Sequence, residues 1–169
     1  MLGHSFGGWL AANYAARYPE RVQTLTLLDP VFVFQGLRWQ VYFISLPASL
    51  PFLPRSWRIR MLSTIGGGPV DPDDPGARMI SEVTEHYAVK LPLPERLTIT
   101  QLRGLQLPVY AALAGRSAMH NSAHAAHVAR AEIPDLTIQL WPEATHSLPM
   151  EQAATLDRTI PAFMTAHDR

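Results

Sequence analysis

The sequence predicts an α/β fold with a doubly wound parallel sheet, and three observations support this. Short apolar segments at residues 22–28, 108–114 and 136–141 are typical of buried strands. Helical segments separate them, as expected where parallel strands are joined by crossover helices. A Gly-x-Ser-x-Gly sequence stands directly before the first helix, and such a serine turn joins a strand to a helix.

The serine turn reads Gly3-His4-Ser5-Phe6-Gly7. We expect Ser5 to occupy a strained turn with its hydroxyl exposed, flanked by glycines because neighbouring backbones pass too close for a Cβ atom. Residues 6–17 are predicted to form a helix with a small-residue face for packing on the sheet, made of Gly7, Gly8, Ala11, Ala12 and Ala15. Because two residues precede the motif, we expect the strand that should carry it to be missing.

Residues 31–54 are largely apolar and aromatic. Three prolines and Arg38 interrupt them, so a membrane span is not predicted. We predict short helices whose apolar faces cover a pocket, and two further helices at 55–65 and 77–89. The loop 66–76 between these two helices begins with a run of three glycines but lacks the Lys-Ser/Thr ending of a phosphate-binding loop.

The serine turn, the helix and strand after it, and a histidine beyond the last strand together resemble the α/β-hydrolase fold family. The resemblance covers the whole chain but only the C-terminal part of the family's domain. It implies that 22–28, 108–114 and 136–141 are the family's strands 6–8, with a helical cap inserted between the first two. The expected division is 1–30 core, 31–105 helical cap and 106–169 core. We expect the reading frame to continue upstream of Met1.

The same resemblance implies a serine nucleophile and a histidine base. Ser5 takes the place of the nucleophile, and His146 lies in the loop after the last strand, where the family carries its catalytic histidine. The backbone N–H of Phe6 would supply one oxyanion donor. The other comes, in the family, from a loop after the third strand.

The acid departs from the common pattern. Most relatives carry an aspartate after the seventh strand, where this chain has Ser117. We favour Asp29, directly after the sixth strand, where a minority of the family places its acid, although an Asp-Pro pair is also an ordinary strand-ending turn. Asp135 lies at the wrong end of the sheet, Glu143 shares the histidine's own loop, and Asn121 is the alternative orienting residue.

Three histidines, His120, His124 and His127, could share one face of a predicted helix over 121–131. A zinc site is the alternative interpretation. The HExxH pattern is absent and no carboxylate accompanies the histidines on that face, so we expect surface or rim residues and no metal.

Composition excludes several classes of function. The chain has 14 basic and 14 acidic residues, so no basic excess indicates nucleic-acid binding. The absence of cysteine excludes disulfides and thiol chemistry. No leader sequence is visible, which favours the cytoplasm.

We therefore predict a carboxylesterase-like serine hydrolase that needs no cofactor. It would act on a hydrophobic acyl ester through an acyl-serine intermediate, with His4, Trp39 and Phe43 contacting the substrate. The alternatives are a non-catalytic relative that uses the pocket for binding, and an inactive fragment.

Overall fold

The computed structural model of the chain describes residues 1–48, 55–68, 78–79, 82 and 94–168. The predicted helix over 77–89 lies almost wholly outside the described residues. So does the end of the apolar segment 31–54, from residue 49 onward.

The core is a parallel sheet of four strands in the order β1-β2-β3-β4. Their bounds are β1 Leu2–His4, β2 Leu25–Leu28, β3 Val109–Ala114 and β4 Leu136–Trp141. The last two match the predicted segments to within one residue. β2 begins three residues later than predicted, because the N–H of Val22 closes the short 3-10 helix η1, Pro19–Arg21, by donating to Pro19 O at 3.2 Å.

The expectation that the strand carrying the serine turn is missing was wrong, and the sheet has four strands instead of three. Three residues suffice for β1 because β2 holds it at both ends. Thr26 N–H donates to Met1 O at 2.8 Å, and Ser5 N–H donates to Leu28 O at 3.1 Å. β1 is therefore the edge strand of the described sheet, in place of β2.

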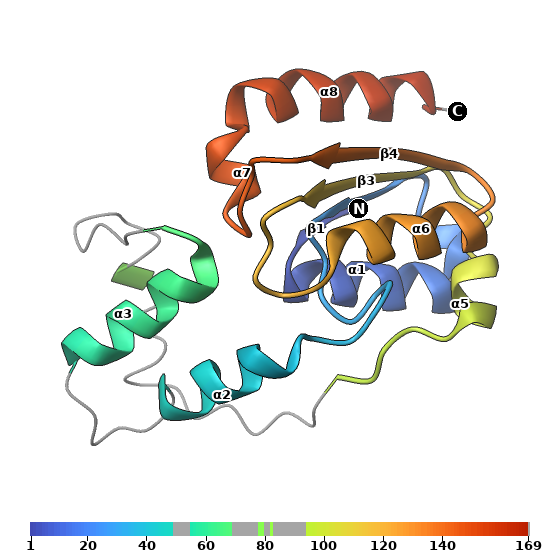
Figure 1. Cartoon of the computed structure of the whole chain (residues 1–169). Coiled ribbons are helices and arrows are strands. Elements are labelled where there is room, and N and C mark those ends of the chain that lie inside the picture. The colour runs from blue at the N-terminus through green and yellow to red at the C-terminus, as the bar shows by residue number, and fades with distance from the viewer. Residues whose placement is uncertain (49–54, 69–77, 80–81, 83–93, 169) are drawn as a thin grey trace.

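Helices cover both faces of the sheet (Figure 1). α1 (Phe6–Arg17) and α6 (Ser122–Glu132) lie on one face, and α8 (Ala153–Ala166) lies on the other. Alternate strand residues point to opposite faces. The α1 and α6 face buries the strand side chains of Leu25, Leu27, Val109, Ala111 and Leu113. The α8 face buries Leu28, Tyr110, Ala112 and Ala114.

Small residues bring the helices close to the sheet. The buried residues of α1 are Gly8, Ala11, Ala12 and Ala15, four of the five residues predicted for this face, whereas Gly7 is half-buried. Those of α6 are Ser122, Ala125, Ala126 and Ala129. The short helices α5 (Ile99–Arg103) and α7 (Leu148–Glu151) complete the core. Leu97, Leu102 and Leu105 pack in the same cluster as α1, so the end of the predicted cap segment 31–105 lies in the core.

Two helices lie outside these layers. α2 (Trp39–Ala48) and α3 (Arg55–Gly66) contact each other beyond the carboxyl ends of the strands (Figure 1). Val41 of α2 is buried against Val31 and Met119, which ties this helix to the core. Among the described residues, no helix is both long and apolar enough to cross a membrane.

The two glycines of the serine turn are not equivalent. A Cβ on Gly3 would lie 2.2 Å from the carbonyl oxygen of Gly7, whereas a Cβ on Gly7 meets nothing within 4 Å. The expected close approach of backbones thus applies to Gly3 and not to Gly7.

Replacing each glycine by alanine tests this difference. Gly3→Ala should lower the free energy of unfolding by about 1–3 kcal/mol, because the crowded atoms belong to the backbone and cannot rotate away. Gly7→Ala should be neutral or stabilising by up to about 1 kcal/mol, because alanine suits a helix better. Urea unfolding followed by circular dichroism measures both. Equal losses in the two variants would contradict the packing described here.

Candidate active site

Ser5 sits in a strained turn between β1 and α1. Its φ of 54° lies in the left-handed region, which is unfavourable for residues other than glycine. The neighbouring strand segment holds this conformation: Ser5 N–H donates to Leu28 O, and Ser5 O accepts from Val31 N–H at 3.2 Å and Gly8 N–H at 3.1 Å. The turn aims the serine at the carboxyl end of the sheet, where the loops after parallel strands meet.

Asp29 follows β2 directly and is fully buried. Its φ of 40° is also left-handed, a conformation that aspartate tolerates better than most residues. Oδ1 accepts from Ala114 N–H at 3.0 Å and faces His120 Nε2 at 3.2 Å. Oδ2 accepts from the Ser117 hydroxyl at 2.6 Å and lies 2.6 Å from His146 Nδ1. The His120 contact has the distance of an ion pair but not the alignment of a hydrogen bond.

His146 lies between the serine and the carboxylate. Its Nδ1 contacts Asp29 Oδ2, and its Nε2 lies 2.9 Å from Ser5 Oγ. Because an ionised carboxylate only accepts hydrogen bonds, Nδ1 carries the proton, which leaves Nε2 as the acceptor for the serine hydroxyl. A serine, an imidazole and a carboxylate linked in this order can transfer the serine proton to the imidazole.

The ionised state of Asp29 follows from its surroundings. Burial alone would raise the pKa of this carboxyl. The contacts with His120 and His146, the charge of His120 and the hydrogen bond from Ser117 outweigh burial and hold the pKa of Asp29 well below its usual range. The carboxylate is thus charged at neutral pH.

The loop that carries His146 is fixed at several points. His4 Nε2–H donates to His146 O at 2.9 Å, and the two rings lie 4.9 Å apart. Thr145 N–H donates to Glu151 Oε2 at 2.8 Å. Burial lowers the pKa of His4, the hydrogen bond with His146 O opposes this, and the nearby imidazole of His146 lowers the pKa further. His4 therefore supports the histidine loop at neutral pH as an uncharged ring.

The same loop also contacts the C-terminal end of α3. The hydroxyl oxygens of Thr145 and Ser147 lie 2.9 and 2.8 Å from the carbonyl oxygen of Gly66. A Cβ on Gly67, whose φ is 88°, would lie 2.3 Å from Thr145 Cβ. The two residues that flank His146 thus hold α3 against the site.

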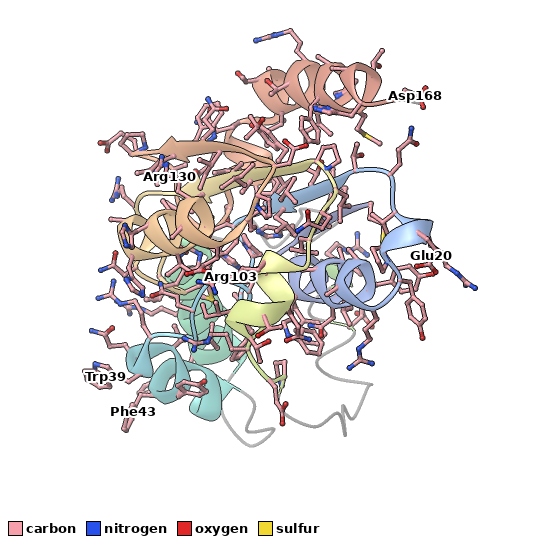
Figure 2. The ribbon with its side chains drawn as sticks, turned by 90° about the vertical axis from the view of Figure 1, so that its right-hand side faces the viewer. Glu20, Trp39, Phe43, Arg103, Arg130 and Asp168 are labelled. Atoms are coloured by element: carbon pink, nitrogen blue, oxygen red, sulfur yellow. The ribbon has the colours of Figure 1, made fainter. Side chains whose placement is uncertain are left out.

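The structure gathers some of the predicted site residues and leaves others apart. Ser5, Asp29 and His4 each contact His146, and Phe6 begins α1 beside the serine, with its ring stacked on Trp9 at 5.2 Å. Trp39 and Phe43 lie together on the outer surface of α2, 67% and 72% exposed (Figure 2). In the described residues, no hydrogen bond or ring contact links either ring to the serine, the carboxylate or His146.

The other candidates for the acid lie elsewhere. Asp135 is exposed at the amino end of β4, and Glu143 is an exposed residue 4.0 Å from Arg116. Asn121 caps α6, its Oδ1 accepting from His124 N–H at 3.1 Å. Of the four candidates, Asp29 is the one in contact with His146.

Sequence reasoning missed the roles of Ser117 and His120. The expectation of a surface or rim position was wrong for His120, which precedes α6 and is buried against Asp29, whereas His124 and His127 are exposed on the helix. In the described part of the chain, no three metal-ligating side chains are grouped to hold a metal ion. One feature of the sequence could have indicated these contacts: Ser117 stands at the position where the acid was expected.

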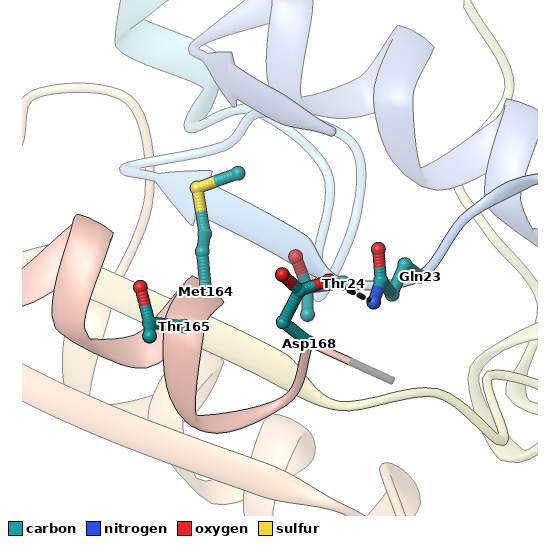
Figure 3. Close-up of a pocket in the computed structure, with 5 residues that line it drawn as sticks. All are labelled: Gln23, Thr24, Met164, Thr165 and Asp168. Atoms are coloured by element: carbon teal, nitrogen blue, oxygen red, sulfur yellow. Dashed lines mark hydrogen bonds between the residues drawn. The ribbon is translucent and has the colours of Figure 1, made fainter.

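A separate pocket lies at the other end of the sheet. Gln23, Thr24, Met164, Thr165 and Asp168 line a space of about 170 Å³ between the start of β2 and the end of α8 (Figure 3). Gln23 Nε2 donates to Asp168 Oδ1 at 2.8 Å across it. Because Asp29 follows the opposite end of β2, this pocket is not part of the site.

Comparisons with known proteins agree with this fold. Residues 1–64 match the family described as the alpha/beta hydrolase fold. The chain is 22% identical to an uncharacterised carboxylesterase of Bacillus subtilis over 98% of its own length and 56% of that protein's. A lipase of Mus musculus acting on (lyso)-N-acylphosphatidylethanolamine is 60% identical over 30 residues, 18% of this chain and 9% of the lipase.

Solved structures share the architecture. Carboxylesterase CesB from Bacillus subtilis superposes with a TM-score of 0.84 at 22% identity, covering 96% of this chain and 58% of that one. Naproxen esterase from the same organism gives 0.79 at 22% identity, with the same coverage. The chain thus spans less than two thirds of the length of these relatives.

The buried carboxylate predicts how stability depends on pH. Because the pKa of Asp29 is lower in the folded state than in the unfolded chain, where it is about 3.9, Asp29 stabilises the fold above that pH. This contribution is lost as the pH falls toward the folded value. The difference in unfolding free energy between the protein and Asp29→Asn should therefore shrink between about pH 6 and pH 2. Denaturant titrations measure it, and a difference independent of pH would contradict the assigned charge.

Proposed function

We propose that this chain, which belongs to the α/β-hydrolase fold family, carries the catalytic residues of a carboxylesterase-like serine hydrolase. The observation that carries the proposal is the chain of contacts from Ser5 Oγ to His146 Nε2 at 2.9 Å and from His146 Nδ1 to Asp29 Oδ2 at 2.6 Å. Carboxylesterases among the relatives of the same fold support ester hydrolysis as the reaction.

The mechanism would begin with attack by the serine. Ser5 Oγ adds to the carbonyl carbon of the ester while His146 Nε2 takes the hydroxyl proton. Asp29 remains ionised, keeps the proton on Nδ1 and stabilises the imidazolium. His146 then gives its proton to the departing alcohol, which leaves an acyl-serine. A water molecule, deprotonated by the same imidazole, releases the acid and restores the hydroxyl.

The negative charge on the carbonyl oxygen needs hydrogen-bond donors. Phe6 begins α1, and the first N–H groups of a helix have no acceptor within it. We assign the Phe6 N–H as one donor to the oxyanion. Removal of a single such donor typically costs on the order of 10²–10³ in rate, so this group is a substantial part of the proposed machinery.

The proposed substrate is a hydrophobic acyl ester. α2 lies beyond the carboxyl ends of the strands, the end of the sheet at which Ser5 follows β1 (Figure 1). Trp39 and Phe43 are exposed on α2, with their rings in edge-to-face contact at 5.5 Å. We propose that these rings, with His4, meet the substrate.

Ester hydrolysis by substituted variants tests the catalytic assignment. Ser5→Ala should abolish turnover of p-nitrophenyl butyrate. Asp29→Asn should lower kcat by about 10⁴-fold with little change in KM, because the wrong imidazole tautomer would face the serine. Asp135→Asn is the matched control: it removes an exposed aspartate at the opposite end of the sheet and should leave kcat unchanged.

Two outcomes would contradict the assignment of the catalytic residues. A folded protein without ester turnover would favour a binding role for the pocket. A loss in Asp135→Asn as large as that in Asp29→Asn would place the acid elsewhere.

The aromatic pair gives a separate prediction about selectivity. Trp39→Ala and Phe43→Ala should each weaken the preference for long-chain over short-chain p-nitrophenyl esters by about 1–3 kcal/mol in kcat/KM. Because both side chains are largely exposed, the substitutions should barely change the melting temperature. Equal losses on both chain lengths would show that these rings do not contact the acyl chain.

A further inference from the structure

Asp29 contacts a second histidine, His120, which has no role in the mechanism described above. His120 Nε2 lies 3.2 Å from Asp29 Oδ1, on the opposite carboxylate oxygen from His146. The side chains of His120 and Asp29 are 2% and 0% exposed, so the contact is shielded from water. Two imidazoles thus approach one carboxylate from two sides.

Ser122 lies beside the ring of His120. Nδ1 of His120 lies 3.4 Å from Ser122 Oγ, and the hydroxyl of Ser122 donates to the carbonyl oxygen of Ala114. In the described residues Nε2 makes no hydrogen bond, and its ion-pair contact is with the Asp29 oxygen at 3.2 Å. A proton on Nε2 therefore has this carboxylate as its acceptor, and an unprotonated Nε2 would put a lone pair against a buried anion.

The origin of these contacts is also informative. His120 and Ser117 come from the loop after β3, where the family resemblance leads one to expect the acid itself. Here the acid follows the neighbouring strand, and the loop supplies one hydrogen-bond donor, Ser117, and one ion-pair contact, His120. The position after β3, where the acid was expected, is thus occupied by Ser117 and His120, which contact the carboxylate of Asp29.

We propose that His120 is a positioning residue, which holds Oδ1 of Asp29 so that Oδ2 stays aimed at His146. The proposal rests on the function proposed above, in which Asp29 is the acid of the site. Ala114 N–H binds Oδ1, while the Ser117 hydroxyl and His146 Nδ1 bind Oδ2. His120 adds a second contact on Oδ1 and further opposes rotation of the carboxylate about its Cβ–Cγ bond.

Substitutions of His120 separate a positioning role from simple packing. His120→Leu keeps an apolar group of similar bulk and removes the donor. His120→Gln can place an amide N–H near the position of Nε2, whereas the shorter His120→Asn cannot. His124→Gln makes the same exchange at an exposed histidine of α6 and serves as the control.

The expected result is a loss in kcat that depends on the donor. His120→Leu and His120→Asn should lower kcat for p-nitrophenyl butyrate by about 10- to 100-fold, the size expected for the loss of one polar contact with a charged group, with KM within about twofold. His120→Gln should recover most of the loss, and His124→Gln should have the activity of the unsubstituted protein. Three folded variants with unchanged kcat would overturn the proposal.

Proton NMR tests the same inference without turnover. The His146 Nδ1–H, 2.6 Å from Asp29 Oδ2, should give a resonance far downfield of the backbone amides. It should move upfield or broaden in His120→Asn and return in His120→Gln. If the unsubstituted protein hydrolyses no ester, the proposed function fails, and this resonance still decides whether His120 orients the pair. A resonance unchanged in His120→Asn would overturn the proposal.

Discussion

The structure of the site depends on one buried charge, the carboxylate of Asp29. A carboxylate with no exposure to water is tolerated in a protein interior only if donors or cations compensate it. Here the donors come from three separate places: the end of β3, the loop after it, and the loop after β4. The hydrogen bonds to this one carboxylate therefore hold together the carboxyl ends of the neighbouring strands β2, β3 and β4.

The strained backbone of the site follows from the same requirement. Ser5 and Asp29 both have positive φ, and each directly follows a strand of the parallel pair β1 and β2. The backbone of this pair holds the serine turn, while Asp29 holds the imidazole that faces the serine. Residues kept in unfavourable conformations by their surroundings are characteristic of functional sites. The positions of the nucleophile, the base and the acid are thus linked to one another by hydrogen bonds.

Local patterns predicted much of this arrangement. The Gly-x-Ser-x-Gly turn and the apolar runs of β3 and β4 can be recognised within a few residues, so both strands were predicted to within one residue, and Ser5 and His146 lie after β1 and after β4. β1 was missed because three residues show no periodicity, and its pairing with β2 defines it. Ser117 and His120 were missed for a similar reason: their partner lies more than 85 residues away in sequence, and only folding brings the loop onto Asp29.

The central claim is that Ser5 is activated by an imidazole which Asp29 holds in place. Reaction with a fluorophosphonate, followed by peptide mass spectrometry, tests it most directly, because such reagents modify serines that a neighbouring base has made nucleophilic. We expect one stoichiometric adduct, on the peptide containing Ser5, formed orders of magnitude more slowly in Asp29→Asn. Labelling of another serine, or labelling of Ser5 at the same rate without the carboxylate, would contradict it.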